Sequence, residues 1–429
     1  VRFEVLEGGG AVQPREARTD EAGRAFARWT LGSDVGGQAV MATVPGAQEP
    51  VVTFRATGEA PLETSAPEGS TTDPAPSEPV EEAPSPLSVR VRSQPLAVGG
   101  GFVCGLRNRS PECSGNIERR PGSGSNMGGI RALSAGVSHG CGLTESGMAW
   151  CWGSNESGQL GDGTTRDREA AVLVQTNGSF SQLTAGLSHT CGLDAAGAAF
   201  CWGRNVNGQL GDRSRQDRST PGPVQDGASF RSLAAGWNHT CGLSPGGQLL
   251  CWGLNGDGQL GDGTRIDRLV PTPVSGSFQS LAAGSGHTCG ISGDRVLCWG
   301  SNQFGQLGNG TPGTAGTSTP APVQGLPSPP RSVTVGAVHT CALLSDGEAY
   351  CWGQNLHGQL GDGTTENRAL PVQVEGGLSF VGLYAGGAVT CGLADDGARY
   401  CWGMNQNGQL GDGTRVNRSS PVRVGGTAP

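Results

Sequence analysis

Residues 189–212 read HTCGLDAAGAAFCWGRNVNGQLGD, and this stretch recurs along most of the 429-residue chain. A Cys-Trp-Gly tripeptide and a Gly-Gln-Leu-Gly signature follow the leading cysteine in each copy. That cysteine returns every ~50 residues, at Cys141, Cys191, Cys241, Cys289, Cys341 and Cys391. A seventh, degenerate copy opens the series, with Cys104 and Cys113 at the two cysteine positions. We therefore expect an architecture of seven repeats.

The two cysteines of each repeat flank a short polar stretch, which predicts a β-hairpin. In the second repeat, opposing Cys141 to Cys151 leaves residues 145–147 (ESG) as a three-residue loop ending in the glycine that such a turn prefers. In the fifth repeat the cysteines are one residue closer, and the same pairing leaves residues 293–294 (GD) as a two-residue hairpin turn. A shorter turn thus accommodates the missing residue, and the cysteines remain opposite each other, which supports the predicted pairing of the two strands.

Counting outward from either turn places the cysteines opposite each other at a non-hydrogen-bonded site, where Cα atoms lie ~4.5 Å apart. Such a separation suits a disulfide. We predict seven bridges, each within one repeat: Cys104–Cys113, Cys141–Cys151, Cys191–Cys201, Cys241–Cys251, Cys289–Cys298, Cys341–Cys351 and Cys391–Cys401. Paired cysteines in this number indicate an oxidising compartment.

A zinc site is the alternative use of these cysteines. A histidine stands two residues before the first cysteine in five repeats, on the same strand face: His139, His189, His239, His287 and His339. The spacing is not that of usual zinc motifs, and Phe102 and Val389 take the histidine position in the first and last repeats. We favour repeated core histidines that make a hydrogen bond, and we predict no metal or cofactor.

The hairpin is apolar on both faces, so both faces must be covered, which repeats stacked face to face achieve. Turn residues and a short proline-containing segment such as 371–374 follow each Cys-Trp-Gly. With the strand around Leu-x-Ala-Gly, each repeat supplies about four short strands, the size of one propeller blade.

The pattern Gly-x-x-His-Thr-Cys-Gly-Leu, followed by Cys-Trp-Gly-x-Asn-x-x-Gly-Gln-Leu-Gly-Asp-Gly-Thr, resembles the repeat of the regulator of chromosome condensation family. The resemblance covers residues 87–429 and implies an all-β, seven-bladed β-propeller. The first repeat lacks the Gly-Gln-Leu-Gly-Asp loop, and Pro111 is expected to interrupt its second hairpin strand. Residues 89–91 (VRV) either complete the last blade or begin the first.

Two further segments precede the propeller. Residues 1–58 are similar to the later strands of bacterial immunoglobulin-like domains of surface adhesins, which implies a partial β-sandwich and an export signal upstream of residue 1. Residues 59–86 hold seven prolines and seven acidic residues, a composition typical of an extended linker.

The charge of the propeller limits its partners. Residues 87–429 carry 23 acidic residues and 23 arginines, and the chain has no lysine. A neutral surface is a poor binder of nucleic acid. The resemblance also implies nucleotide exchange on a small GTPase with nucleosome binding, but disulfides and neutral charge suit neither partner.

No catalytic motif stands apart from the repeats. The oxygen-rich segment 255–262 offers a calcium alternative, although its spacing is not that of a calcium loop, and an aspartate bonded to its own turn explains the same residues. An arginine recurs a few residues after the Asp-Gly-Thr loop in five repeats, and we interpret it as a tether between blades. These residues are Arg168, Arg218, Arg268, Arg368 and Arg418.

Function is expected where the repeat does not dictate the residue. Two loop positions vary freely, before His-Thr and before Gly-Gln-Leu-Gly, and they hold the candidate partner-binding residues Trp237, Phe304, Leu356 and His357. Our leading hypothesis is an exported, non-enzymatic surface protein that binds another protein or a surface polymer through these loops. The alternatives are a secreted enzyme inhibitor, since some propellers of this family block β-lactamases, and a carbohydrate-active enzyme.

Overall fold

The computed structural model describes five N-terminal strands and then residues 95–116, 127, 129–225, 227–313 and 316–425. The chain divides into two compact units, Val1–Pro86 and Leu87–Pro429. The first contains a sheet of β1 (Arg2–Glu7), β4 (Gly36–Thr43) and β5 (Val52–Gly58) and a pair of β2 (Ala11–Gln13) and β3 (Arg28–Thr30). The immunoglobulin-like sandwich and the linker at 59–86 stay predictions, because the side chains of the first and all of the second lie outside the described residues.

The second unit is the predicted seven-bladed propeller, in which each blade is a separate antiparallel sheet. Blades one to three comprise β6 (Leu96–Val98), β7 (Phe102–Arg107) and β8 (Ser110–Gly115); β9 (Ile130–Ala135), β10 (His139–Thr144), β11 (Ala149–Gly153) and β12 (Arg168–Leu173); and β13 (Gln182–Ala185), β14 (His189–Leu193), β15 (Ala199–Gly203) and β16 (Arg218–Pro223). Blades four and five comprise β17 (Ser232–Ala235), β18 (His239–Leu243), β19 (Leu249–Gly253) and β20 (Arg268–Val274); and β21 (Ser280–Ala283), β22 (His287–Ser292), β23 (Arg295–Gly300) and β24 (Thr317–Pro322). Blades six and seven comprise β25 (Pro330–Val335), β26 (His339–Leu344), β27 (Ala349–Gly353) and β28 (Arg368–Gln373); and β29 (Phe380–Gly386), β30 (Val389–Ala394), β31 (Arg399–Gly403) and β32 (Arg418–Arg423).

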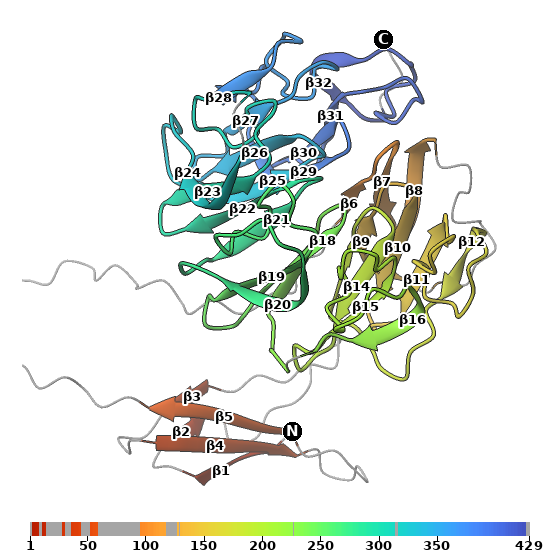
Figure 1. Ribbon diagram of the computed structural model, residues 1–429. Helices are drawn as coiled ribbons and strands as arrows, with labels where there is room; N and C mark the ends of the chain where they lie inside the picture. The colour runs from red at the N-terminus through yellow and green to blue at the C-terminus, as the bar shows by residue number, and fades with distance from the viewer. Residues whose placement is uncertain are drawn as a thin grey trace, which may run out of the picture. The chain divides into compact units, whose positions relative to one another are not determined.

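The first strands of the blades form a closed inner ring. Each contacts the first strand of the next blade, and β29 contacts β6 to complete the circle. Figure 1 shows inner strands such as β21, β25 and β29 toward the middle of the propeller and fourth strands such as β12, β20 and β28 at its periphery. Blade seven takes all four strands from its own repeat, ending in β32. Residues 89–91 lie outside the described residues.

The predicted hairpin register is confirmed. Cys141 opposes Cys151 and Leu143 opposes Ala149 in blade two, and the two-residue turn of blade five lies between Ser292 and Arg295. All seven predicted disulfides are present, with Cα atoms 4.0 Å apart in blade one and 4.1 Å apart in the others. Every cysteine is used in these bridges, which leaves no thiolate for the zinc alternative.

The bridges lie in the apolar layers between blades, which is why the hairpin is apolar on both faces. Between blades two and three, the Cys141–Cys151 bridge packs with Leu160 of blade two and with Phe180 and Trp202 of blade three. The two aromatic rings stack with centroids 5.7 Å apart. Equivalent layers separate the following blades.

A chain of buried hydrogen bonds also joins consecutive blades. The backbone oxygen of Gln159 in blade two accepts the Thr190 hydroxyl (2.9 Å) and the Trp202 indole N–H (3.0 Å) of blade three. The Thr190 hydroxyl lies 2.9 Å from Nε2 of His139 in blade two. Because that hydroxyl already donates to Gln159, it accepts from His139, which therefore carries its proton on Nε2. We call this arrangement the His-Thr-Gln relay.

The relay recurs at every junction from blade two to blade seven. Its histidine–threonine pairs are His139–Thr190, His189–Thr240, His239–Thr288, His287–Thr340 and His339–Thr390. The two junctions of blade one lack both partners together: Phe102 and Gly140 of blade two take the histidine and threonine positions at one junction, and Val389 of blade seven packs with Val103 of blade one at the other. The prediction that the histidines are core residues making a hydrogen bond is confirmed. Where the first or last repeat lacks the histidine, the repeat that follows it around the ring also lacks the threonine.

Blade one is irregular, as expected, but Pro111 does not interrupt its strand. Pro111 lies within β8 and opposes Leu106, two pairs away from the Cys104–Cys113 pair. Pairs alternate along a hairpin, so Leu106–Pro111 is again a non-hydrogen-bonded pair, and the proline nitrogen faces away from β7. Because β8 is the outermost described strand of its sheet, the missing N–H costs no ladder bond.

The relay predicts that the propeller loses stability in mild acid. Burial lowers the pKa of the five relay histidines to about 3 or 4, whereas an unfolded histidine titrates near ~6.5. The unfolded chain therefore binds more protons below that pH, and each histidine removes about 2 kcal/mol of stability between pH 6.5 and pH 5. Guanidinium unfolding with the disulfides intact should show the midpoint falling across this range. A midpoint that stays constant to pH 5 would contradict the buried neutral state.

A double-mutant cycle at His239 and Thr288 tests the relay itself. Thr288→Val leaves the His239 N–H buried without an acceptor, a loss of about 1–3 kcal/mol. His239→Val with Thr288→Val recreates the apolar pair found naturally at the junction of blades seven and one, so its cost should fall short of the sum of the singles by about 1–2 kcal/mol. It should also lose about a fifth of the acid dependence. Additive costs would mean that the two side chains are not coupled.

Candidate protein-binding face

Two sets of loops meet at one end of the propeller, which we call the loop face. Inner loops join the first and second strands of a blade, and outer loops join the third and fourth; adjacent strands are antiparallel, so both sets emerge at the same end. Backbone bonds tie each outer loop to the inner loop of its own blade, as from Leu254 N to Asn238 O at 2.8 Å. All four predicted partner-binding residues lie on this face.

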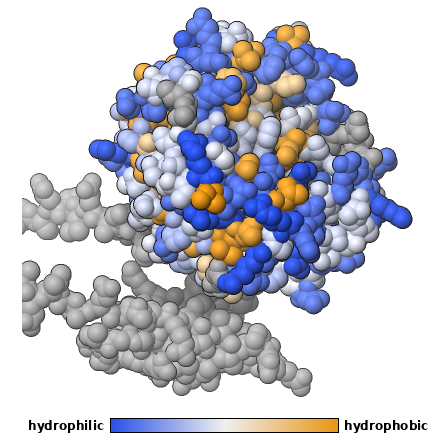
Figure 2. Space-filling view, viewed as in Figure 1, coloured by the Kyte–Doolittle hydropathy of each residue, from blue (hydrophilic) through white to orange (hydrophobic). Residues whose placement is uncertain are grey.

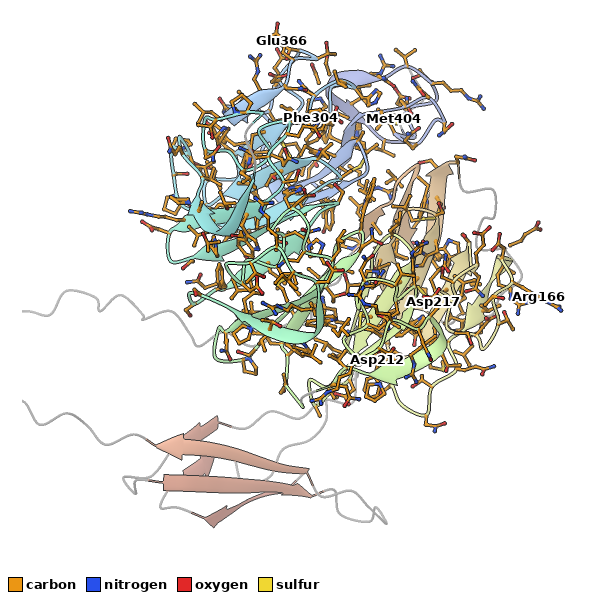
Figure 3. All side chains as sticks on the ribbon, viewed as in Figure 1. Arg166, Asp212, Asp217, Phe304, Glu366 and Met404 are labelled. Carbon is orange, nitrogen blue, oxygen red and sulfur yellow. A yellow bond between two sulfur atoms is a disulfide. The ribbon has the colours of Figure 1, made fainter. Side chains whose placement is uncertain are left out.

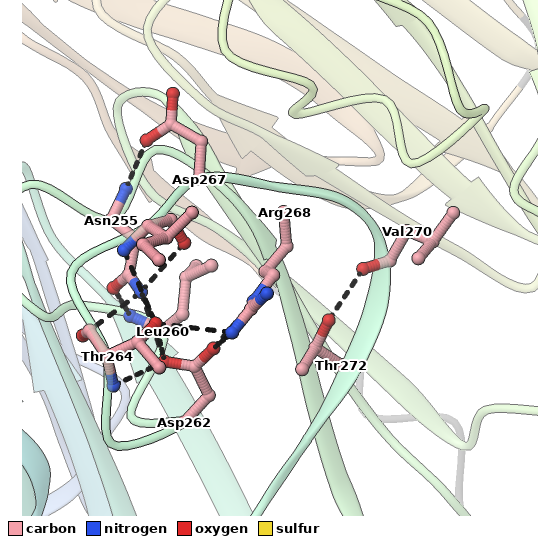
Figure 4. Close-up of polar contacts among 9 residues, drawn as sticks. Asn255, Leu260, Asp262, Thr264, Asp267, Arg268, Val270 and Thr272 are labelled. Atoms are coloured by element: carbon pink, nitrogen blue, oxygen red, sulfur yellow. Dashed lines mark hydrogen bonds and ion pairs between the residues drawn. The ribbon is translucent and has the colours of Figure 1, made fainter.

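A buried asparagine organises each outer loop. In blade four, Oδ1 of Asn255 accepts the amide of Leu260, and its Nδ2 donates to Asp262 Oδ1 at 3.1 Å and to the backbone oxygens of Thr264 and Ile266. The same carboxylate oxygen of Asp262 accepts the amide and hydroxyl of Thr264 (Figure 4). The repeated Asn-x-x-Gly-Gln-Leu-Gly-Asp-Gly-Thr therefore fixes the loop backbone through a single side-chain network.

The recurring arginine closes this network within its own blade. Arg268 Nη2 lies 2.6 Å from Asp262 Oδ2, and the equivalent pairs are Arg168–Asp162, Arg368–Asp362 and Arg418–Asp412. The prediction of a tether between blades is therefore wrong: the arginine pairs with the aspartate six positions before it. Blade five lacks both partners, with Asn309 and Thr317 in their places.

The aspartates stay ionised inside this network. Burial alone would raise the pKa of Asp262, but hydrogen bonds from Thr264 and Arg268 and the guanidinium charge outweigh it and hold that pKa below its ordinary value. The pKa values of Asp162, Asp362 and Asp412 are lowered in the same way. Because protein N–H and O–H groups already occupy these oxygens, the aspartate bonded to its own turn accounts for the residues that suggested calcium.

The outer loops of blades two to six also contact the next blade. Amides at equivalent loop positions donate to the fourth strand of the following blade, as from Gly263 to Ser318 O and from Gly363 to Ser419 O, both at 2.9 Å. In blade three this position is Arg213, which adopts a φ of 66° where the other blades have glycine, and it donates to Leu269 O. The loops are therefore held from both sides.

Trp237 lies at the end of the central channel. It belongs to the inner loop of blade four, is 38% exposed, and lines a cavity whose other lining residues are glycine, alanine and valine from all seven blades. Its amide donates to Gly284 O of blade five, and its oxygen accepts the Leu187 amide of blade three. The indole is thus a large side chain on a fixed backbone at the centre of the face.

The other three candidates lie on outer loops. Leu356 is 60% exposed, whereas Phe304 and His357 are half-buried. His357 Nδ1 lies 3.2 Å from Asn417 Nδ2 of the next blade, so part of its role is to join blades six and seven. Figure 3 shows Phe304 on the loops of blade five and Glu366 farther out on those of blade six.

Three further exposed apolar residues lie on the same face: Val206 at 42%, Ile266 at 64% and Val416 at 60%. Val206 belongs to the variable position before Gly-Gln-Leu-Gly but was not among the candidates, whereas sequence reasoning missed Ile266 and Val416. Val416 is next to Asn417 and so lies beside the Leu356–His357 segment. Val206 and Ile266 lie near each other in the same way, because Arg215 contacts both Val206 O and Asp267. Ile266 and Val416 could have been found from the sequence, because the residue two positions before the recurring arginine varies between repeats. It is Arg166, Gln216, Ile266, Glu366 or Val416.

On the side of the propeller seen in Figure 2, apolar side chains form separate small patches within a polar surface. Within the described residues, no helix combines the length and hydrophobicity that crossing a bilayer requires.

Comparison with known proteins identifies the repeat. The family profile described as RCC1-like domain matches residues 100–428. Among curated proteins, the E3 ubiquitin-protein ligase HERC2 of Homo sapiens is 48% identical over 44 residues, which are 10% of this chain and 1% of HERC2. The matching part thus spans a very small share of that relative.

Solved structures share the fold at low identity. Yeast RCC1 (Prp20) bound to Kap60 has a TM-score of 0.66 at 21% identity, covering 84% of this chain and 91% of that one. Prp20p from Saccharomyces cerevisiae, described with its binding to Gsp1p and histones, has a TM-score of 0.65 at 23% identity and covers 80% and 87%. The ectodomain of the Physcomitrella patens receptor kinase CR4 has a TM-score of 0.50 at 24% identity and covers 72% and 73%.

The outer-loop network predicts a coupled response at Asp262 and Arg268. Asp262→Asn leaves the half-buried Arg268 guanidinium without its carboxylate, and amide exchange across residues 256–267 should rise by about tenfold. Adding Arg268→Thr recreates the natural pair of blade five and should restore much of the protection. Hydrogen exchange read by mass spectrometry checks this, with β18 and β19 as the internal reference. Equal exchange in the single and double variants would contradict the coupling.

Proposed function

Because this chain belongs to the RCC1-like domain family, we propose that it is a non-enzymatic binding module whose loop face engages another protein or a surface polymer outside the cytosol. The observation that carries the proposal is the gathering of exposed apolar side chains on that face. Among the residues whose burial the structure describes, five of the nine exposed large hydrophobic residues lie there: Val206, Trp237, Ile266, Leu356 and Val416. Exposed apolar and aromatic side chains on a rigid backbone are the usual anchors of protein interfaces.

The chemistry of the face favours binding over catalysis. The axial cavity is lined by glycine, alanine, valine and one tryptophan, which offer neither a nucleophile nor a proton donor for chemistry. The repeated aspartates that follow Gly-Gln-Leu-Gly, such as Asp262, are engaged by threonine, asparagine and arginine. Their carboxylates therefore hold the loops in shape rather than project toward a substrate.

The neighbours in structure support a protein partner. Kap60, Gsp1p and histones are the partners named for yeast Prp20p, so this fold presents surfaces to proteins. We do not carry those partners over, because the propeller of this chain is neutral and braced by seven disulfides. Bridges of this number favour an oxidising compartment, and the similar structure from the receptor kinase CR4 is that of an ectodomain.

Photo-crosslinking from the full chain tests the proposal. A photoreactive residue replaces Leu356 in one variant and Met148 in another; Met148 is 45% exposed but lies on the hairpin turn at the opposite end of its blade. We expect adducts with a discrete partner from position 356 on intact cells or their secreted proteins, and none from position 148. The same adducts from both positions, or none from either, would contradict the proposal.

Substitutions then show how much each exposed side chain contributes to the affinity for the captured partner. Trp237→Ala and Leu356→Ser should each weaken binding by about tenfold or more, as expected for hot-spot residues, while Met148→Ser should stay within about twofold. Surface plasmon resonance gives the affinities. Unchanged affinity in both loop-face variants would show that another surface binds.

The identity of the captured partner separates the remaining alternatives. The inhibitor alternative predicts a secreted hydrolase, such as a β-lactamase, whose turnover stops when the full chain is added in equimolar amount. The surface-binding proposal predicts a partner that is a wall, membrane or matrix component, with no change in any turnover.

A further inference from the structure

The bridge of blade one is exposed in a way that the other six are not. Thirteen of the fourteen cysteines are at most 1% exposed, whereas Cys113 is half-buried on β8. In a complete blade the second cysteine opposes a residue of the fourth strand, as Cys151 opposes Val172 and Cys251 opposes Thr272. Among the described residues, β8 has no such neighbour.

Blade one also lacks buried polar contacts that join the other blades. At its junction with blade two the relay is absent, since Phe102 and Gly140 take the places of histidine and threonine. The first repeat has no Gly-Gln-Leu-Gly loop, and the buried Trp152 indole nitrogen accordingly has no hydrogen-bond partner among the described residues.

The junction with blade seven keeps one relay bond. Ser114 stands where the other repeats have tryptophan, and its hydroxyl donates to the backbone oxygen of Gln409 at 2.9 Å. Val103 and Val389 replace the threonine and histidine and pack with Leu96, Val98 and Leu410. The ring therefore closes mainly by apolar contact.

We propose that Cys104–Cys113 is a thiol-exchange site, and that its reduction loosens the ring at blade one while the other six bridges persist. The reductant is a dithiol, either small or borne on a protein. One thiolate of the dithiol attacks Cys113 Sγ, the sulfur–sulfur bond breaks, and Cys104 leaves as a thiolate that takes up a proton. The second thiolate of the dithiol then displaces Cys113, so two electrons pass to the cysteines and the dithiol ends as a disulfide.

The loosening follows from what holds β7 and β8 in place. The bridge joins the central strand of blade one to its outermost described strand. Blade one lacks the histidine–threonine pair at both junctions. Among the described residues it is held by the Ser114–Gln409 bond, by backbone bonds such as Ile130 N to Arg109 O, and by apolar packing, so the disulfide is the covalent restraint on β7 and β8. Blades three to six keep the relay on both sides.

Reduction kinetics on the full chain test the site directly. The folded protein is treated with dithiothreitol in native buffer, quenched with iodoacetamide at intervals, and mapped by mass spectrometry. Cys104 and Cys113 should be alkylated together, at a rate about tenfold or more above that of any other pair. Equal rates for all pairs, or another pair reacting first, would overturn the proposal.

Hydrogen exchange on the selectively reduced protein tests the consequence. Exchange should rise in β6, β7 and β8 and along β29, and stay unchanged in β17–β20. Cys104→Ser with Cys113→Ser should reproduce this pattern, and the matched pair Cys241→Ser with Cys251→Ser should instead affect blade four. Selective reduction with no change in exchange at blade one would overturn the loosening. If a variant fails to fold, the alkylation kinetics of the wild-type protein still test the proposal.

Discussion

At the five junctions from blade two to blade seven, the buried carbonyl oxygen of the glutamine in Gly-Gln-Leu-Gly joins one blade to the next. It accepts a threonine hydroxyl of the following blade and, at the first four of these junctions, a tryptophan N–H as well, and the threonine hydroxyl accepts a hydrogen bond from a histidine of the preceding blade. All of these groups are buried, so an unpaired member would cost more than a formed bond contributes. The residue in one repeat is therefore constrained by the residue in its neighbour. The matched replacements at Phe102–Gly140 and Val389–Val103 follow from that constraint.

The loop face combines rigid support with variable display. Repeated residues, such as Asn255 and Asp262, fix the backbone of each outer loop, and the following blade supports it from the side. Residues outside that network, such as Leu356 and Ile266, are free to vary and are exposed. Side chains at these positions can therefore change without disturbing the scaffold, because they take no part in the network that fixes the loop backbone.

The sequence predicted those features that depend on local geometry. Cysteine spacing and turn length determine the hairpin register, and with it the seven bridges and the repeat count. Features that depend on contacts between two repeats were harder to predict from the sequence. Nothing within one copy shows that His139 meets a threonine 51 residues away, or that Arg268 pairs with its own Asp262 rather than with the next blade. The position of Pro111 was misjudged because its effect depends on which side of the strand has a neighbour. Exposure at Ile266 and Val416 depends on how loops from two blades meet.

The disulfides connect residues only 9 or 10 positions apart, and this bears on how the protein matures. Fourteen thiols admit a very large number of pairings, yet here each correct partner is the nearest one along the chain. A blade can thus oxidise as soon as its own hairpin has formed, before later repeats have been synthesised. Each disulfide can then form independently of the others during folding. Because both cysteines of a bridge belong to one repeat, the gain or loss of a whole repeat in evolution leaves no unpaired cysteine.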